Sequence, residues 1–303
     1  MAGDAYQRLE IGEQLGHLEY AVTPEQLQLF REAVEFPEAC FPNIAAKEYA
    51  EVLVRKHGRI PVISAKHQDH YLRPPRLLKR LQVTGWVREK YQRRGRRWLV
   101  VETFSVDEDG TEVVRSQHTF MLPDLEVPKS ADTKSAMPPE LALPGGERLP
   151  PLTKVLSQDK IDRFETLSRG LRPSVEAVNP RAEGLRLPQM GQTPPRNIHT
   201  DAALAEAMGL SAPNASGQMA FAYLHELLAR RFGDDFLWGG QLAVTFVKPL
   251  AAGDAVTAHG VIRERRAEER RTQFIIEVWL ESQRGDKTAV GEGRVTAPSP
   301  LRE

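Results

Sequence analysis

The chain has 303 residues, a length that exceeds one compact domain and suits two. Acidic and basic residues balance at 41 each, which argues against broad electrostatic capture of nucleic acid or of an anionic membrane. No apolar run approaches the roughly 18 residues that a membrane span needs, and the acidic N-terminus lacks the apolar region of a signal peptide. The single Cys40 excludes an intramolecular disulfide framework and a cysteine-only metal cage. We therefore expect a cytoplasmic two-domain protein without a metal ion or cofactor.

The second half of the chain repeats the pattern of the first. Aligning Arg73-Pro74 with Lys248-Pro249 gives an offset of 175 that holds without a gap for about fifty residues. Glycines, charged residues and apolar positions agree along this stretch, for example Gly85 with Gly260. Upstream, residues 22–30 resemble 156–164, and 43–45 resemble 197–199, at offsets of 134 and 154. The growing offset indicates a duplication whose second copy has two extra segments, around 171–192 and 211–233.

Between the copies, a segment rich in proline and glycine predicts a linker at 127–151. The resulting division is an N-terminal domain at 1–126, the linker, and a C-terminal domain at 152–303.

Each copy shows the pattern of an antiparallel meander. Segments rich in Val, Ile, Thr and aromatic residues alternate with turn signals such as Arg284-Gly285-Asp286. We expect strands at 66–72, 78–88, 97–106 and 112–122 in the first copy, and at 241–247, 255–265, 271–282 and 288–297 in the second. The second copy also contains a helical segment at 218–232 that is apolar on most sides and should be buried, for instance by a curved sheet. The equivalent interval of the first copy has room for little of this helix.

His199 is the first candidate for chemistry. It stands at a loop-to-helix junction, just before a short predicted helix at 201–208 that Thr200 or Asp201 can cap and Gly209 can end. The first copy has Ala45 at this position, so the imidazole occurs only in the copy that keeps its long helix. A structural histidine is the plain alternative, but this asymmetry favours a functional one.

The second candidate is the segment 213–218, at the start of the apolar helix. Ser216 and Gly217 are small enough for a ligand to approach the backbone, and Asn214 lies two residues earlier. Free N–H groups at a helix start can hydrogen-bond a carbonyl oxygen that gains negative charge. A simple cap by Ser216 is the alternative, and the nearby imidazole favours an oxyanion hole.

Other histidines suggest packing. His67 and His70 lie on an alternating strand, where positions three apart face opposite sides, so we do not expect a metal site there. Tyr223 and His225 lie on the apolar helix and are expected to be packing residues with polar tips.

The pattern from Asn197 to Asp201, followed by Ala205, Gly209, Ser216-Gly217 and Phe246-Val247-Lys248-Pro249, resembles the MaoC-like (R)-specific enoyl-CoA hydratases, also called hydratase 2. The resemblance covers essentially the whole chain. It implies an α+β fold, a double hot-dog of two tandem units in which only the C-terminal unit has a complete central helix. It also implies addition or removal of water across the 2,3 double bond of an acyl-CoA thioester, here with an unusual or bulky acyl group.

The resemblance implies roles for individual residues. His199, Gly217, Asn197 and Asp201 would be catalytic, with the Gly217 N–H holding the thioester oxygen, and Ser216, Asn214, Arg196 and Lys248 would bind substrate. Arg263 is a further basic residue that can meet the phosphates of CoA.

One position departs from the family pattern. The family has aspartate five residues before the histidine, and this chain has Pro194 there, or Pro195 with a one-residue slip. Asp201, Glu176 and Glu183 are the candidate replacements, and the residues do not decide among them.

Two other functions stay open at this point. One is a hot-dog acyl-CoA thioesterase, and the other is a non-catalytic acyl-CoA-binding subunit that has lost the aspartate. The resemblance also implies a homodimer of double hot-dog chains.

Overall fold

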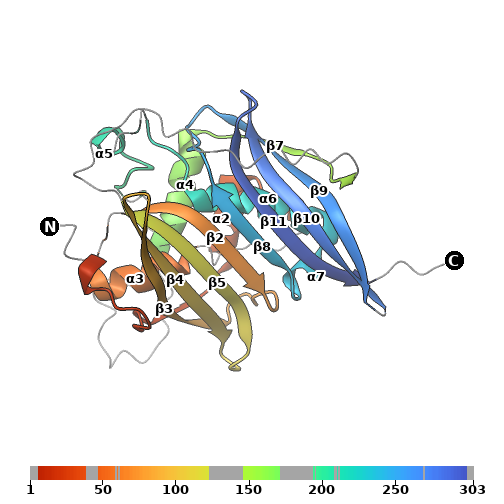
Figure 1. Cartoon of the computed structure of the whole chain (residues 1–303), viewed down its shortest axis with the longest axis horizontal. Coiled ribbons are helices and arrows are strands. Elements are labelled where there is room, and N and C mark those ends of the chain that lie inside the picture. Colours follow the sequence, from red (N-terminus) through yellow and green to blue (C-terminus); the bar gives the residue numbers. More distant parts are fainter. Residues whose placement is uncertain are drawn as a thin grey trace.

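The computed structural model describes residues 6–38, 47–58, 60, 62–122, 146–170, 194, 196–207, 210, 212–268 and 270–298. In this part of the chain, one antiparallel sheet of eleven strands is flanked by helices (Figure 1). The strands are β1 Leu18–Ala21, β2 Ile63–Tyr71, β3 Arg80–Arg93, β4 Arg96–Asp107, β5 Glu112–Leu122, β6 Glu147–Arg148, β7 Leu152–Val155, β8 Gln241–Phe246, β9 Ala255–Glu268, β10 Arg271–Ser282 and β11 Lys287–Pro298. The helices are α2 Pro24–Val34, α3 Glu48–His57, α4 Gln158–Gly170, α5 Ala202–Ala207, α6 Gly217–Phe232 and α7 Asp234–Leu237. Of these helices, none is both long and apolar enough to cross a membrane.

The sheet contains the same strand order twice. The first half runs β1-β3-β4-β5-β2, and the second runs β7-β9-β10-β11-β8, with the short β6 also paired to β9. The halves join where β2 pairs with β8, with Lys66 opposite Thr245. Each strand of the first half thus has a counterpart in the second, and the predicted antiparallel meanders are confirmed. The linker prediction lies mostly outside the described residues, so the domain boundaries remain a prediction.

The central helix of the second unit is α6, which the sequence predicted to be buried. Of its 16 residues, 13 are buried, against β9, β10, β11, β8 and β2. Glycine in β11 permits this close packing, because a Cβ at Gly293 would lie 2.6 Å from Cδ1 of Leu228. Burial on all sides explains why the helix is apolar around most of its circumference.

The first unit has a shorter helix in the corresponding place. The ten residues of α3 pack against β1, β3, β4 and β5, and a Cβ at Gly85 would lie 2.8 Å from Val52. The sequence predicted little helix in the first copy, yet α3 spans ten residues there; the longer central helix, α6, lies in the C-terminal unit. Helices α2 and α4 are a further matched pair, and they contact each other through Phe30 and Phe164, with ring centroids 5.9 Å apart.

The first turn of α3 buries a carboxyl group. Glu48 is 1% exposed and accepts hydrogen bonds from the hydroxyls of Tyr20 and Ser105. Burial raises the pKa of Glu48 from 4.5 to about 7, although both hydrogen bonds act in the opposite direction. Between about pH 4.5 and pH 7, the folded chain therefore keeps a proton on Glu48 that the unfolded chain releases.

Glu48 should make stability depend on pH in a defined direction. Because its pKa is higher in the folded state, its contribution to stability is fully present below about pH 4.5 and is lost as pH rises through 7. Glu48→Gln, which cannot ionise, should gain about 3 kcal/mol relative to wild type between pH 4 and pH 8. Urea unfolding of both proteins at the two pH values measures this difference. An unchanged difference would contradict the raised pKa.

Candidate active site

A tight turn before α5 presents His199. The backbone N–H groups of Thr200 and Asp201 donate to the carbonyl of Asn197, and the side-chain Oδ1 of Asn197 accepts from the His199 N–H at 2.8 Å. The Asp201 carboxylate then caps α5 by accepting from the N–H of Leu204 at 3.0 Å. Both side chains therefore fix the backbone that carries the imidazole.

The hydrogen bond at the imidazole determines which nitrogen is free. Nδ1 of His199 lies 2.7 Å from the backbone carbonyl oxygen of Asn214. A carbonyl can only accept, so Nδ1 carries the proton and the neutral ring keeps its lone pair on Nε2. Burial lowers the pKa of His199, the Glu165 carboxylate raises it, and Lys47 lowers it. The resulting pKa of His199 is lower than the usual histidine value, so the ring is neutral and able to act as a base at neutral pH.

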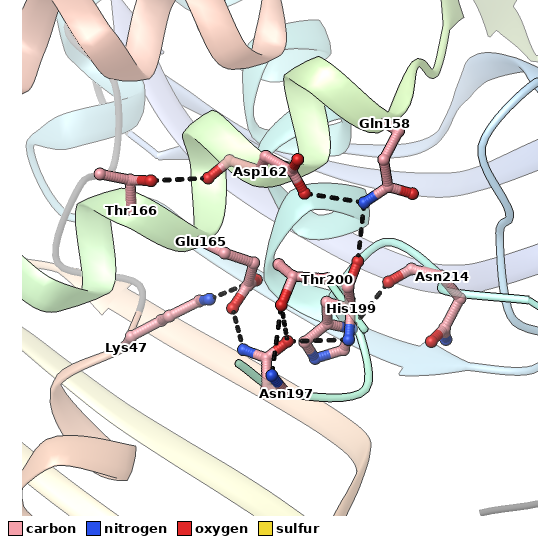
Figure 2. Close-up of polar contacts among 9 residues, drawn as sticks. All are labelled: Lys47, Gln158, Asp162, Glu165, Thr166, Asn197, His199, Thr200 and Asn214. Atoms are coloured by element: carbon pink, nitrogen blue, oxygen red, sulfur yellow. Dashed lines mark hydrogen bonds and ion pairs between the residues drawn. The ribbon is translucent and has the colours of Figure 1, made fainter. Parts of the chain in front are cut away.

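A carboxylate that sequence reasoning missed lies beside this imidazole. Glu165 of α4 is buried, with Oε1 2.7 Å from Nζ of Lys47 and Oε2 2.9 Å from Nδ2 of Asn197 (Figure 2). Burial alone raises the pKa of Glu165, but the charges of Lys47 and His199 and both hydrogen bonds bring it down to about 2. The side chain is therefore a fixed anion. Lys47 comes from the N-terminal unit, so both halves of the chain build this pair.

One face of α4 holds the whole loop. Gln158, Asp162 and Glu165 recur at the three- and four-residue spacing of a single helix face. Nε2 of Gln158 donates to the backbone carbonyl of His199 at 3.0 Å and to Oδ1 of Asp162 at 2.8 Å (Figure 2). This periodic polar face was the available signal for Glu165, but only the fold shows that it meets the His199 loop.

The start of α6 forms the other side of the candidate site. Ser216 is the N-cap residue, yet its hydroxyl does not cap the helix, and the first helical hydrogen bond runs from the N–H of Met219 to the Ser216 carbonyl. The N–H of Gly217 precedes that bond. A Cβ at Gly217 would lie 2.9 Å from the Phe246 ring, so glycine allows this packing. Ser216 Oγ and Asn214 Oδ1 are buried and have no hydrogen-bond partner among the described residues, which leaves both oxygens available to hydrogen-bond a polar ligand or water.

The predicted site residues separate into two groups. Close to His199 lie Asn197 and Asn214, and three residues after Asn214 the chain reaches Gly217. Arg196 and Asp201 instead pair with each other, and Lys248 pairs with Asp286 at 2.6 Å on the surface. The sequence suggested Asp201 as a replacement base. In the structure its carboxylate caps α5 and pairs with Arg196.

The other candidate replacements, Glu176 and Glu183, lie outside the described residues, as do Pro195 and the whole of the 171–192 segment. His67 and His70 face opposite sides of β2, as predicted, with His67 buried. His225, predicted to pack, is buried and lies 3.1 Å from the Tyr71 hydroxyl. No cluster of three or more His, Cys, Asp or Glu residues suited to a metal ion occurs in the described ranges.

Solved structures share this fold, whereas no protein-family model and no curated protein matches the sequence. A MaoC-like dehydratase aligns with a TM-score of 0.68 at 15% identity, over 98% of this chain and 100% of the other. A MaoC-like dehydratase from Phytophthora capsici gives 0.66 at 12% identity, over 97% and 98%. A Mycobacterium tuberculosis protein described as having a double hotdog fold gives 0.60 at 11% identity, over 97% of each chain. The chain therefore has the double hot-dog fold that MaoC-like dehydratases share, as the sequence predicted.

Proposed function

We propose that the protein is a hydratase or dehydratase that adds or removes water across the 2,3 double bond of an acyl-CoA thioester. The observation that carries this proposal is the unprotonated Nε2 of His199. The Nδ1 contact to the Asn214 carbonyl fixes this tautomer, and the Glu165 carboxylate interacts electrostatically with the ring. An imidazole in this tautomer is a general base, and the nearby start of α6 offers an N–H to a developing oxyanion.

In hydration, Nε2 of His199 takes a proton from water as the water oxygen bonds to C3 of the enoyl group. The electron pair of the double bond moves toward the thioester, whose oxygen becomes negative and is held by the N–H of Gly217. The imidazolium then returns the proton to C2, and the thioester stays intact. One imidazole thus serves first as base and then as acid, and dehydration reverses these steps.

Glu165 supports this cycle as an anion. Its low pKa makes it unsuited to donate a proton near neutral pH, so its role is to orient the loop through Asn197 and to stabilise the imidazolium. We propose that Glu165 takes the place of the aspartate that the resemblance implies and that this chain lacks.

Product analysis tests the reaction type. Incubation with a 2-enoyl-CoA should give a thioester heavier by one water, and no free CoA thiol. Release of thiol would favour the thioesterase alternative, and ligand binding without any product would favour a binding subunit.

Lys47 should set the pH at which the site loses activity. Its charge lowers the pKa of His199 and holds Glu165 ionised, so in Lys47→Met the His199–Glu165 pair should take up its first proton at higher pH. The acid limb of kcat/KM should therefore move to higher pH. Lys47→Arg should restore the wild-type limb, and Lys79→Met, which removes a surface partner of Glu108, should not move it. An unshifted limb in Lys47→Met would contradict this role.

A further inference from the structure

The inner face of the first unit carries buried polar residues where the second unit is apolar. His67 and Asp69 of β2 and Ser116 and His118 of β5 are all at most 6% exposed. At the offset of 175, their counterparts in the second unit are Leu242, Val244, Gly291 and Gly293. Buried polar groups that are not hydrogen-bonded destabilise a fold, so each of these side chains needs a hydrogen-bond partner.

At one end of the set, Asp69 is surrounded by donors. Its carboxylate accepts from the Tyr71 hydroxyl at 3.0 Å and from the Ser116 hydroxyl at 2.5 Å, and it lies 2.8 Å from Nε2 of His67. The charge of His67 and these hydrogen bonds hold the pKa of Asp69 below its usual value despite burial. Asp69 is therefore an anion that forms an ion pair with His67.

Asp69, His67 and His118 form a series of polar contacts that ends at Gln218, and the remaining contacts assign the protons along it. Nδ1 of His118 lies 2.9 Å from Nδ1 of His67 and 3.4 Å from Nε2 of Gln218. The Gln218 amide nitrogen can only donate, so Nδ1 of His118 accepts and the shared proton belongs to His67. His118 is then neutral and donates from Nε2 to the Ser64 hydroxyl at 3.2 Å. Burial and the positive His67 lower the pKa of His118, which agrees with this assignment.

The series ends on an acceptor without a partner. With the amide nitrogen of Gln218 directed to His118, its Oε1 is buried and makes no hydrogen bond to the described residues. Gln218 is 1% exposed and directly follows Gly217 in the first turn of α6. Tyr49 stacks on His118, the residue that the Gln218 amide contacts, with ring centroids 3.7 Å apart.

We propose that Gln218 Oε1 recognises a hydroxyl or amino group on the acyl chain of the substrate, and that the Asp69–His67–His118 series positions its carboxamide for this contact. This inference rests on the proposed function and specifies its substrate class: a polar acyl thioester rather than a plain hydrocarbon one.

The physical reason is the asymmetry of buried hydrogen bonds. A substrate with an O–H or N–H group satisfies Oε1, whereas a hydrocarbon chain leaves the acceptor desolvated and unpaired. Sites built to bind a polar group therefore reject analogues that lack it. We expect wild type to prefer a hydroxylated 2-enoyl-CoA over the matched unsubstituted chain by at least about tenfold in kcat/KM.

The test compares chains of equal length with and without a hydroxyl group at successive positions. In Gln218→Leu the preference should disappear because activity on the hydroxylated chain falls, and Gln218→Met serves if that variant does not fold. Gln82→Leu, a surface change on β3 next to Glu19, should keep the preference.

The outcomes separate this inference from the proposed function. Equal hydration of both chains by wild type, as expected if only water satisfies Oε1, would overturn the inference and leave the hydratase proposal standing. A preference that survives in Gln218→Leu would overturn the assignment to Gln218. Hydration of no thioester by wild type would overturn both.

Discussion

His199→Ala is expected to lose at least a hundredfold in kcat/KM for enoyl-CoA hydration, a loss typical of a missing general acid and base. The loss should be large because one imidazole both removes and returns the proton. Steady-state kinetics from the loss of enoyl absorbance measures the change.

A matched control for this variant is His259→Ala. His259 lies on β9 and stacks on Trp279 of β10, so its removal should leave kcat/KM within about twofold. A similar loss in both variants, or none in His199→Ala, would contradict the role of His199.

Glu165→Gln is expected to lower kcat/KM by about a hundredfold, because it removes the charge that stabilises the imidazolium and leaves Lys47 unpaired. The variant should remain more active than His199→Ala, because the Asn214 carbonyl, and not Glu165, fixes the tautomer of the ring. Since the carboxylate raises the pKa of His199, the acid limb should move to lower pH in Glu165→Gln.

The acid limb should shift in opposite directions in the Lys47 and Glu165 variants. Lys47→Met should move the acid limb up and Glu165→Gln should move it down. Shifts of the same sign would show that the limb does not report the His199–Glu165 pair. Glu264→Gln, which removes an exposed partner of Arg266, is the control and should change neither the pH of the acid limb nor kcat/KM.

Much of the fold follows from local pattern. The alternating strands and their turns repeat at a fixed offset, and α6 is apolar on nearly every side, so sheet and central helix are visible in the sequence. The shorter α3 is harder to predict, because its buried face includes polar residues such as Glu48 and Glu51 and therefore does not read as apolar in the sequence.

The contacts of the candidate site follow from the sequence only in part. His199 and Gly217 stand at a loop-to-helix junction and at a helix start, which are local signals. Glu165 lies 34 residues before His199 in the sequence and Lys47 lies in the other copy, so only tertiary packing brings them to the imidazole. The carboxylates predicted as replacements, Asp201, Glu176 and Glu183, all follow α4 in the chain.

The most direct test is absorbance-monitored turnover of 2-enoyl-CoA thioesters by the wild-type protein, with short, branched, aromatic and hydroxylated acyl groups. A hydratase should remove the conjugated enoyl absorbance of at least one thioester without releasing CoA thiol, and the acid limb of kcat/KM should lie below the usual histidine pKa of about 6.5. Unchanged absorbance for every thioester, despite measurable binding of CoA ligands, would contradict the proposed hydration.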